Sequence, residues 1–274
     1  MSKNTRPSKY FLYENAVQTP AEHLHFFSLC GQQYMNRRPY FLREDFCGTF
    51  LLSSEWVKHG PKFQALGLDI DPEPLAYGDK HHYAPLSSDQ KKRLKILPRD
   101  VMSVVKPKAD ITAACNFSFY CLKTEELLYR YFKSAHDALK DDGILILEMV
   151  GGAGFIEKIK ERKKIKLPGV QYTYVWDQVD FNPIQRHGNY AIHFKLEGEK
   201  YGETGHWLKN SFTYDWRNWT IPEVRFWLLQ AGFQEAIVYW EEADDKGRST
   251  DIYLPAEKGD NDYTWLCYVV GVKR

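Results

Sequence analysis

Residues 41–71 read FLREDFCGTFLLSSEWVKHGPKFQALGLDID, and this stretch decides the fold. A short apolar run ends at two carboxylates, Glu44 and Asp45, and a turn of small residues follows. Apolar residues at helical spacing then predict a helix over 50–57, before a glycine–proline pair and a second apolar run over 63–70. The stretch is a strand–helix–strand unit with acids at the carboxyl ends of both strands, where open α/β sheets bind ligands.

The same alternation continues beyond this unit. Three further apolar runs, 94–97, 109–115 and 144–149, are predicted strands, and apolar residues at helical spacing predict a helix over 124–139. This alternation is the pattern of a parallel sheet with helices on both faces, so the expected fold class is α/β.

The pattern changes after the fifth strand. The basic stretch 155–166 is predicted to be helical, whereas 171–180, 189–196 and 208–216 are predicted strands because polar and apolar residues alternate in them. Consecutive strands without helices between them indicate an antiparallel β insertion.

The last part of the chain returns to the core. Thr220 and Glu223 form a capping box that opens a helix. Two predicted strands follow at 233–240 and 263–272, and the polar segment between them, 241–262, is predicted to be a loop. A hairpin at the end of a parallel sheet requires one strand to run antiparallel to the others.

The N-terminal arm, residues 1–40, contains a predicted helix that begins after Thr19 and reaches about Tyr34. Tyr10 and Tyr13 precede this helix in an aromatic segment. Two interpretations stay open: the tyrosines anchor the arm to the core, or they form a lid that closes over a bound ligand.

Composition limits the function classes. The chain has 274 residues, 43% of them hydrophobic, enough for one large domain or one domain with an insertion. A formal net charge of +1 gives no bulk attraction to nucleic acid or membranes, and no apolar run is long enough to span a membrane. The five cysteines form no CxxC pair, so the sequence predicts no disulfide framework and no metal site. We expect a soluble protein of the reducing cytoplasm.

Four segments together point to a known family. They are REDFCGT at 43–49, Asp69 in GLDID, Asp100 in PRDV and the CNFS run after the fourth strand. In these the chain resembles the class I S-adenosylmethionine-dependent methyltransferases, and REDFCGT is similar to an uncharacterised bacterial branch of that family. The resemblance covers 41–149 motif by motif and 220–272 by a helix and two strands.

The resemblance implies a single methyltransferase domain over residues 1–274. Its sheet is expected to be seven-stranded and Rossmann-like, with helices on both faces, a terminal hairpin and an antiparallel β insertion after strand five. The expected parts are the arm at 1–40, a cofactor-binding core at 41–150, a substrate-side insertion at 151–216, and a C-terminal helix and hairpin at 217–274.

The resemblance also implies S-adenosylmethionine as the cofactor. A ribose diol suits the carboxylate of Asp69, an adenine amino group suits Asp100, and the methionine ammonium suits Glu44. The alternative for the two aspartates is solvation of a strand end or a helix cap. The implied cofactor-binding residues are Tyr13, Glu44, Cys47, Gly48, Thr49, Asp69, Ile70, Asp100, Val101, Cys115 and Asn116.

Two departures concern the glycine-rich turn of the family. Phe46 and Phe50 stand where the family has glycines, so only Gly48 remains. A bulky Phe50 is expected to limit how closely a ligand approaches the backbone there.

Methyl transfer by in-line displacement needs mainly alignment and the exclusion of water. Asn116, Ser118 and Tyr120 follow the fourth strand and are the candidates for substrate contacts, with Asn116 or Tyr120 as the catalytic residue that orients the nucleophile. The alternative is that this segment only forms the wall of the pocket.

The predicted function is methyl transfer to a small molecule. The alternatives are a protein or RNA methyltransferase, for which the basic run 158–166 is the only sign of nucleic acid, and a catalytically inactive S-adenosylmethionine-binding protein. An NAD-dependent oxidoreductase is not favoured, because GxGxxG is absent. The expected partner is a small-molecule substrate, with no nucleic acid or membrane, and a homodimer is possible.

Overall fold

The computed structural model describes residues 6–243 and 249–274. In it the chain forms two compact units. The larger, here the sheet unit, comprises Thr19–Gly152 and Trp219–Arg274, and the smaller, here the insertion unit, comprises Ala153–Asn218 and the described residues up to Gln18.

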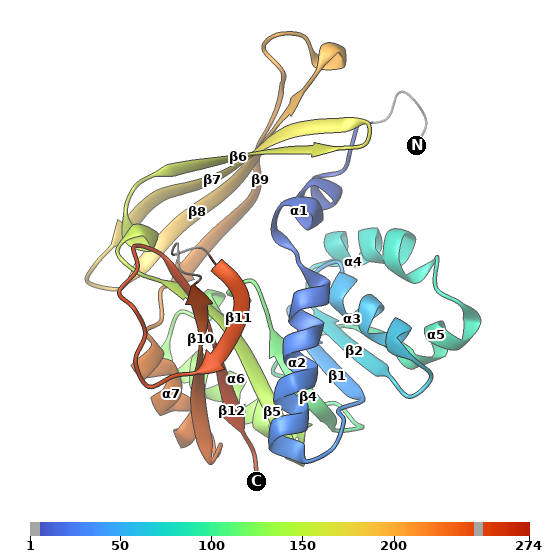
Figure 1. The fold of residues 1–274 in the computed structure, drawn as a ribbon, viewed down its shortest axis with the longest axis vertical. Helices are drawn as coiled ribbons and strands as arrows, with labels where there is room; N and C mark the ends of the chain where they lie inside the picture. The colour runs from blue at the N-terminus through green and yellow to red at the C-terminus, as the bar shows by residue number, and fades with distance from the viewer. Residues whose placement is uncertain (1–5, 244–248) are drawn as a thin grey trace. The chain divides into compact units, whose positions relative to one another are not determined.

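The sheet unit contains one eight-stranded sheet with the order β11-β10-β12-β5-β4-β1-β2-β3 (Figure 1). Strands β1 to β5 run parallel to one another, and β12 runs antiparallel to both β5 and β10. The strands are β1 (Phe41–Asp45), β2 (Gln64–Asp69), β3 (Leu94–Pro98), β4 (Ala109–Ala114), β5 (Leu139–Gly151), β10 (Glu235–Ala243), β11 (Ser249–Pro255) and β12 (Trp265–Val272).

The predicted α/β fold with a terminal hairpin is confirmed, but the predicted strand count is one too low. The additional strand, β11, lies at the edge of the sheet within the segment that was expected to be a loop. Its sequence, STDIYLP, is short and half polar, so it lacks the apolar run that marks a central strand.

Helices cover both faces of this sheet (Figure 1). Leu24 and Phe27 of α2 share one hydrophobic core with Ile144 and Ile146 of β5. Intervening side chains such as Leu145 point to the opposite face, where α6 and α7 contact β5 and β12. The helices are α2 (Pro20–Met35), α3 (Leu51–Trp56), α4 (Pro72–Gly78), α5 (Ser88–Arg93), α6 (Glu125–Ala138) and α7 (Ile221–Gln230).

The insertion unit is a four-stranded antiparallel sheet with the order β6-β7-β8-β9, and the helix α1 (Lys9–Val17) belongs to it. Tyr10 and Tyr13 both contact the ring of Phe212, with centroids 5.6 and 5.0 Å apart, and Tyr172 donates a hydrogen bond of 2.8 Å to the carbonyl of Leu12. The strands are β6 (Lys160–Leu167), β7 (Val170–Asn182), β8 (His187–Glu197) and β9 (His206–Arg217).

The prediction of a basic helix over 155–166 is wrong, because most of this segment forms the edge strand β6. Ile165 is buried and is separated from Leu167 by one lysine, which is the period of a strand. Exposed lysines on an edge strand hinder pairing with another sheet, so this charge run has a structural explanation that needs no nucleic acid.

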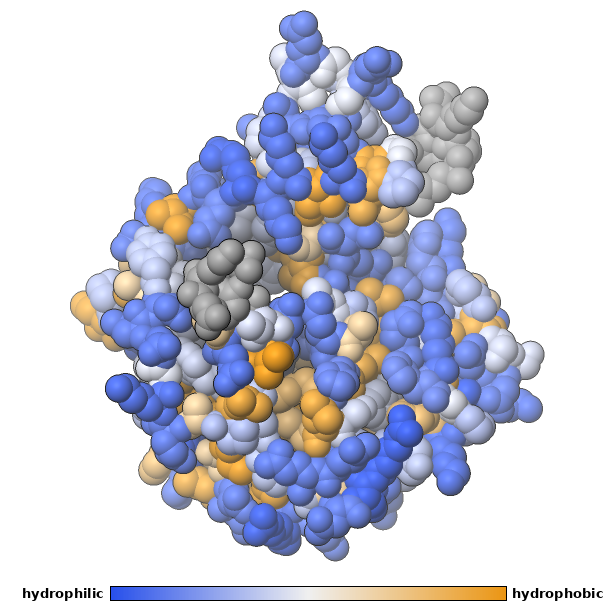
Figure 2. All heavy atoms as spheres, in the orientation of Figure 1, coloured by the Kyte–Doolittle hydropathy of each residue, from blue (hydrophilic) through white to orange (hydrophobic). Residues whose placement is uncertain are grey.

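Hydrophilic residues predominate on the face shown in Figure 2, with hydrophobic residues in small separate groups. Among the described residues, no helix has the length and apolar character needed to cross a membrane.

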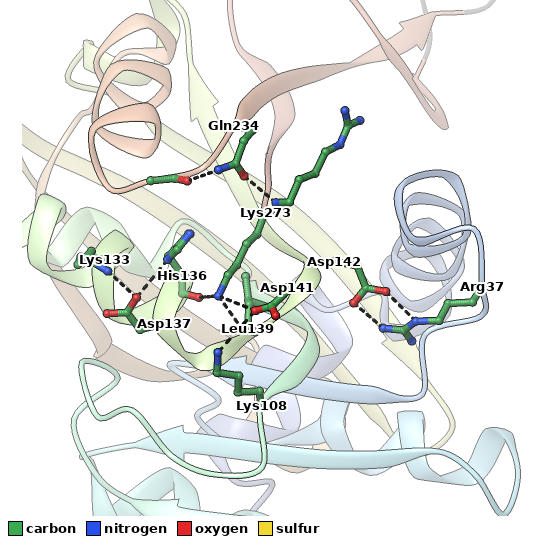
Figure 3. A network of polar contacts seen from close by, with 12 residues as sticks. Arg37, Lys108, Lys133, His136, Asp137, Leu139, Asp141, Asp142, Gln234 and Lys273 are labelled. Atoms are coloured by element: carbon green, nitrogen blue, oxygen red, sulfur yellow. Dashed lines mark hydrogen bonds and ion pairs between the residues drawn. The ribbon is translucent and has the colours of Figure 1, made fainter.

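A polar network holds the last strand at the amino edge of the parallel strands (Figure 3). The ammonium of Lys273 donates to the carbonyls of His136 and Leu139, at 2.9 and 3.0 Å, and lies 3.8 Å from the carboxylate of Asp141. Lys273 therefore joins the end of β12 to the last carbonyls of α6. Burial lowers its pKa.

We expect Lys273→Met to lower the free energy of unfolding by about 1–3 kcal/mol, because it removes the ammonium that donates to the carbonyls of His136 and Leu139, the second of which is a buried bond. The control is Lys133→Met, which removes a half-exposed ion pair with Asp137 and is expected to cost less than about 0.5 kcal/mol. Urea denaturation measures both. Equal effects of the two substitutions would show that Lys273 does not hold the strand.

Candidate functional site

The strand order places a topological switch point beside β1. The chain proceeds from β1 through β2 to β3 in one direction and then returns to β4 on the other side of β1. The loops that leave β1 and β4 therefore part at their carboxyl ends, and such a crevice is where open α/β sheets bind ligands.

The turn after β1 is fastened to the end of β2. The backbone N–H of Gly48 donates to Oδ2 of Asp69 at 2.8 Å, and the N–H of Cys47 donates to the carbonyl of Leu68 at 3.0 Å. Gly48 has φ +52°, and a Cβ at this position would meet no atom within 4 Å. The turn thus has an open side on which a ligand can reach the backbone.

The two phenylalanines of this turn do not cover its open side. Phe46 and Phe50 have left-handed backbone conformations, with φ of 55° and 48°. The Phe50 side chain is fully buried in the core, where it lies so close to α4 that a Cβ at Gly78 would be 2.4 Å from its ring. The ring of Phe46 packs against that of Tyr131 at 5.5 Å. Contrary to expectation, the Phe50 ring is directed into the core and not over the turn.

Glu44 is a buried acid at the end of β1. Its Oε2 accepts hydrogen bonds from the backbone N–H and the hydroxyl of Ser53, at 2.9 and 2.5 Å. Burial raises the pKa of Glu44 to about 7, although the bonds from Ser53 oppose this shift. A cation beside this carboxyl group would favour its ionised form.

Arg43 supports the loop after β3, and sequence analysis missed it. Its side chain is 1% exposed. The guanidinium donates to Asp45 at 2.7 Å, to the carbonyl of Ser103 at 2.9 Å and to the carbonyl of Val101. Tyr131 donates to the other oxygen of Asp45 at 3.2 Å. The only sequence signal for the ion pair of Arg43 and Asp45 was the presence of charged residues in a strand that was expected to be buried.

The residue predicted to bind adenine, Asp100, lies on that loop, and another predicted cofactor residue, Ile70, lies at the end of β2. Asp100 is exposed, and its Oδ1 accepts from the N–H of Met102 at 2.7 Å, whereas Val101 is buried. Ile70 follows Asp69 and is 72% exposed. An exposed isoleucine beside a carboxylate suits a ligand with an apolar ring and polar substituents.

The turn after β4 is also strained. Asn116 and Phe117 both have left-handed backbones, with φ of 53° and 57°. The N–H of Asn116 donates to Oε2 of Glu148 at 2.6 Å. The hydroxyl of Ser118 is buried and has no hydrogen-bond partner among the described residues, which is a feature of sites completed by a ligand.

Tyr120 is fully buried, and its hydroxyl donates to the carbonyl of Val150 at 2.8 Å. This bond ties the turn after β4 to the end of β5. The role of Tyr120 in orienting a nucleophile stays a prediction.

Three donors from separate elements, two of them buried and one partly buried, meet behind this turn, and the sequence did not reveal them. They are the imidazole of His23 in α2, the thiol of Cys115 after β4 and the carboxylate of Glu148 in β5, with their ligand atoms within 4.8 Å of one another. Burial alone would lower the pKa of His23, but Cys115 and Glu148 raise it well above 6.5. Since 92 residues separate the first two in the chain, no local motif could show the cluster.

The structure assigns the predicted cofactor residues to both units. Tyr13 lies in the insertion unit, on Phe212. The others lie in the sheet unit, at or next to the carboxyl ends of its parallel strands; they are Glu44, Cys47, Gly48, Thr49, Asp69, Ile70, Asp100, Val101, Cys115 and Asn116.

No protein-family model and no curated protein matches the sequence. Solved structures match it in fold. DesVI of Streptomyces venezuelae is 15% identical, with a TM-score of 0.71 over 97% of this chain and 96% of that chain. CalS10, an amino pentose methyltransferase from Micromonospora echinaspora involved in calicheamicin biosynthesis, is 14% identical, with a TM-score of 0.69 over 98% of this chain and 99% of that chain.

A third similar structure is the sugar N-methyltransferase KedS8 from Streptoalloteichus sp ATCC 53650. It is 15% identical, with a TM-score of 0.68 over 99% of this chain and 95% of that chain. At these identities the likeness establishes the fold: a Rossmann-like α/β sheet with an antiparallel β insertion.

We expect Arg43→Leu to lower the free energy of unfolding by about 3–5 kcal/mol, because it leaves Asp45 buried without its cation. The double variant Arg43→Leu/Asp45→Leu is expected to recover a large part of this loss, since both charges are then removed. Urea denaturation of the two single variants and the double variant measures the coupling. Additive losses would contradict a buried ion pair.

The raised pKa of Glu44 predicts how the stability of the protein changes with pH. Its pKa is about 7 in the folded protein and 4.5 in its ordinary state, so the unfolded chain loses this proton first as the pH rises. The stability that Glu44 contributes therefore falls between pH 4.5 and 7, by about 3 kcal/mol at most.

The test of this prediction is Glu44→Gln, which keeps an acceptor for Ser53 but does not titrate. We expect the variant to gain stability relative to the wild type as the pH rises through this window. Urea denaturation at a series of pH values measures the difference. A constant difference across the window would contradict the raised pKa.

Proposed function

We propose that the protein is an S-adenosylmethionine-dependent methyltransferase that acts on a small molecule. One observation carries the proposal: at the switch point beside β1, the open turn at Gly48 is bonded to Asp69, and Ile70 lies exposed next to it. Similar structures support the choice of cofactor, since CalS10 was solved with S-adenosylmethionine and the glycopeptide N-methyltransferase MtfA with S-adenosylmethionine, S-adenosylhomocysteine or sinefungin.

The residues at the edge fit the parts of this cofactor. Each carboxylate oxygen of Asp69 accepts one backbone N–H, from Gly48 and from Asp71. A carboxylate has about four lone-pair sites, so about two remain for the ribose hydroxyls. The apolar side chain of Ile70 and the carboxylate of Asp100 suit the adenine ring and its amino group. Glu44 suits the ammonium of the methionine part.

The methyl group arrives on a sulfonium that is already activated when the cofactor is bound. The protein then has to align the acceptor and exclude water. We assign this task to the turn after β4, where Asn116 is held in a strained conformation and the hydroxyl of Ser118 is free to bond a ligand.

An amino sugar is the acceptor class that we favour. CalS10 is described as an amino pentose methyltransferase and KedS8 as a sugar N-methyltransferase, and both are covered along nearly their whole length. An amine acceptor has to lose a proton, and a base or desolvation in the site would accomplish this.

Two alternatives lose their support. The inactive binding protein was motivated by Phe46 and Phe50, but the Phe50 ring is buried in the core, away from the open side of Gly48. RNA methylation was motivated by a basic run that forms an edge strand.

The first experiment is calorimetric titration of the purified protein with S-adenosylmethionine, S-adenosylhomocysteine and NAD. We expect micromolar binding of both adenosyl compounds and no binding of NAD. Asp69→Asn should weaken the binding of S-adenosylhomocysteine about 10–100-fold, because it replaces a charged acceptor of the ribose hydroxyls by a neutral one.

The matched control is Asp71→Ala. Asp71 lies two residues away and caps α4 through the N–H of Glu73. We expect this variant to lose about 0.5–2 kcal/mol of stability and to bind the ligand as the wild type does. Failure of the wild type to bind either adenosyl compound, or equal losses of affinity in the two variants, would overturn the proposal.

A further inference from the structure

We propose that His23, Cys115 and Glu148 form a zinc-binding site in the sheet unit. The three side chains offer one nitrogen, one sulfur and one oxygen, all within 4.8 Å of one another. His23 and Glu148 are 7% and 8% exposed and Cys115 is partly buried, so two of the three ligands lie inside the unit.

The contacts of His23 direct its Nε2 toward Glu148. Its Nδ1 lies 3.0 Å from the carbonyl of Thr19, and a carbonyl can only accept, so Nδ1 carries the proton. Nε2 then faces Oε2 of Glu148, and a zinc ion would replace the proton between these two atoms. A metal-binding histidine characteristically donates its other N–H to a backbone carbonyl or a carboxylate in this way.

A hydrogen bond with the backbone also orients Glu148. Its Oε2 accepts the N–H of Asn116 at 2.6 Å, which orients the carboxylate toward His23. Ligating carboxylates are commonly hydrogen-bonded to such a second layer of groups. Both ligands are therefore fixed by the backbone of neighbouring elements, α2 and the turn after β4.

The separation of the two donors fits a metal ion between them. Nε2 of His23 and Oε2 of Glu148 are 3.4 Å apart. Charged N–H···O bonds are shorter, about 2.7–2.9 Å. In tetrahedral zinc coordination, with Zn–N and Zn–O bonds of about 2.0–2.2 Å, the two donors lie about 3.4 Å apart.

The donor set selects the metal. Thiolate and imidazole ligands favour zinc over magnesium and calcium, which prefer oxygen. Coordination by zinc deprotonates a thiol, so Cys115 would bind as the thiolate. Thiolate and carboxylate then neutralise the divalent ion, so no net charge is buried. In tetrahedral geometry the S···N separation is about 3.6 Å, which is inside the 4.8 Å within which the three ligand atoms lie.

Three protein ligands leave a fourth position for water or for a heteroatom of a bound molecule, as in zinc sites that act on substrates. The cluster adjoins Asn116 through its bond to Glu148. The inference stands on the geometry of these side chains and does not depend on the proposed function.

The test uses the full-length protein, stripped with a chelator and titrated with zinc against a chromophoric competitor. We expect one zinc ion per chain, and binding at least about tenfold weaker in Cys115→Ser and in His23→Gln. Cobalt substitution adds an independent readout: a thiolate-to-cobalt absorption band is expected in the wild type and not in Cys115→Ser.

The controls are Cys121→Ser and His25→Gln, which remove an exposed thiol and an exposed imidazole, the latter on the same helix as His23. Both should bind zinc and cobalt as the wild type does. Urea denaturation of the stripped variants confirms that they are folded. Absence of stoichiometric zinc binding, or equal affinity in Cys115→Ser and Cys121→Ser, would overturn the proposal and leave an ion pair.

Discussion

The carboxylate of Asp69 is the constraint on which the candidate cofactor site depends. One oxygen receives the N–H of Gly48 from the turn after β1, and the other receives the N–H of Asp71 at the start of α4. The turn after β1 packs tightly against β2, since a Cβ at Gly67 would lie 2.9 Å from the thiol of Cys47. The turn, the end of β2 and the next helix are therefore held as one assembly, whose open side is the one at Gly48.

Backbone strain is present in both turns that flank the switch point. Phe46 and Phe50 after β1, and Asn116 and Phe117 after β4, all have φ values between 48° and 57°. A left-handed non-glycine residue costs on the order of 1–3 kcal/mol and persists only where its surroundings enforce it. Burial of the Phe50 ring, and the bond from Asn116 to Glu148, are the enforcing contacts. Strain of this kind clusters at functional sites, which agrees with a site between these turns.

Much of the sheet unit could be predicted because its signals are local. The helix that begins at Pro20 and the Thr220 capping box are both present, as are the five parallel strands. The prediction was wrong for the edge strands β6 and β11, where charged and polar residues obscure the alternation of apolar residues that is typical of a strand.

In the site, as in the fold, residues that belong to a local sequence pattern could be predicted and residues joined by long-range contacts could not. Asp69 and Gly48 could be singled out because a known motif pattern places acids and glycines at strand ends. Arg43 could not, because its partners on the loop after β3 are 58 and 60 residues away. Neither could the pair of His23 and Glu148, separated by 125 residues, because such contacts exist only after the helix α2 has packed on the sheet.

The most direct test of a cofactor site at the switch point is a crystal structure of the protein with S-adenosylhomocysteine. Our account predicts both ribose hydroxyls within about 2.5–3.0 Å of the Asp69 carboxylate, with the adenine ring against Ile70. A structure in which the ligand lies away from the turn at Gly48, with the Asp69 carboxylate bonded only to its two backbone N–H groups, would contradict it.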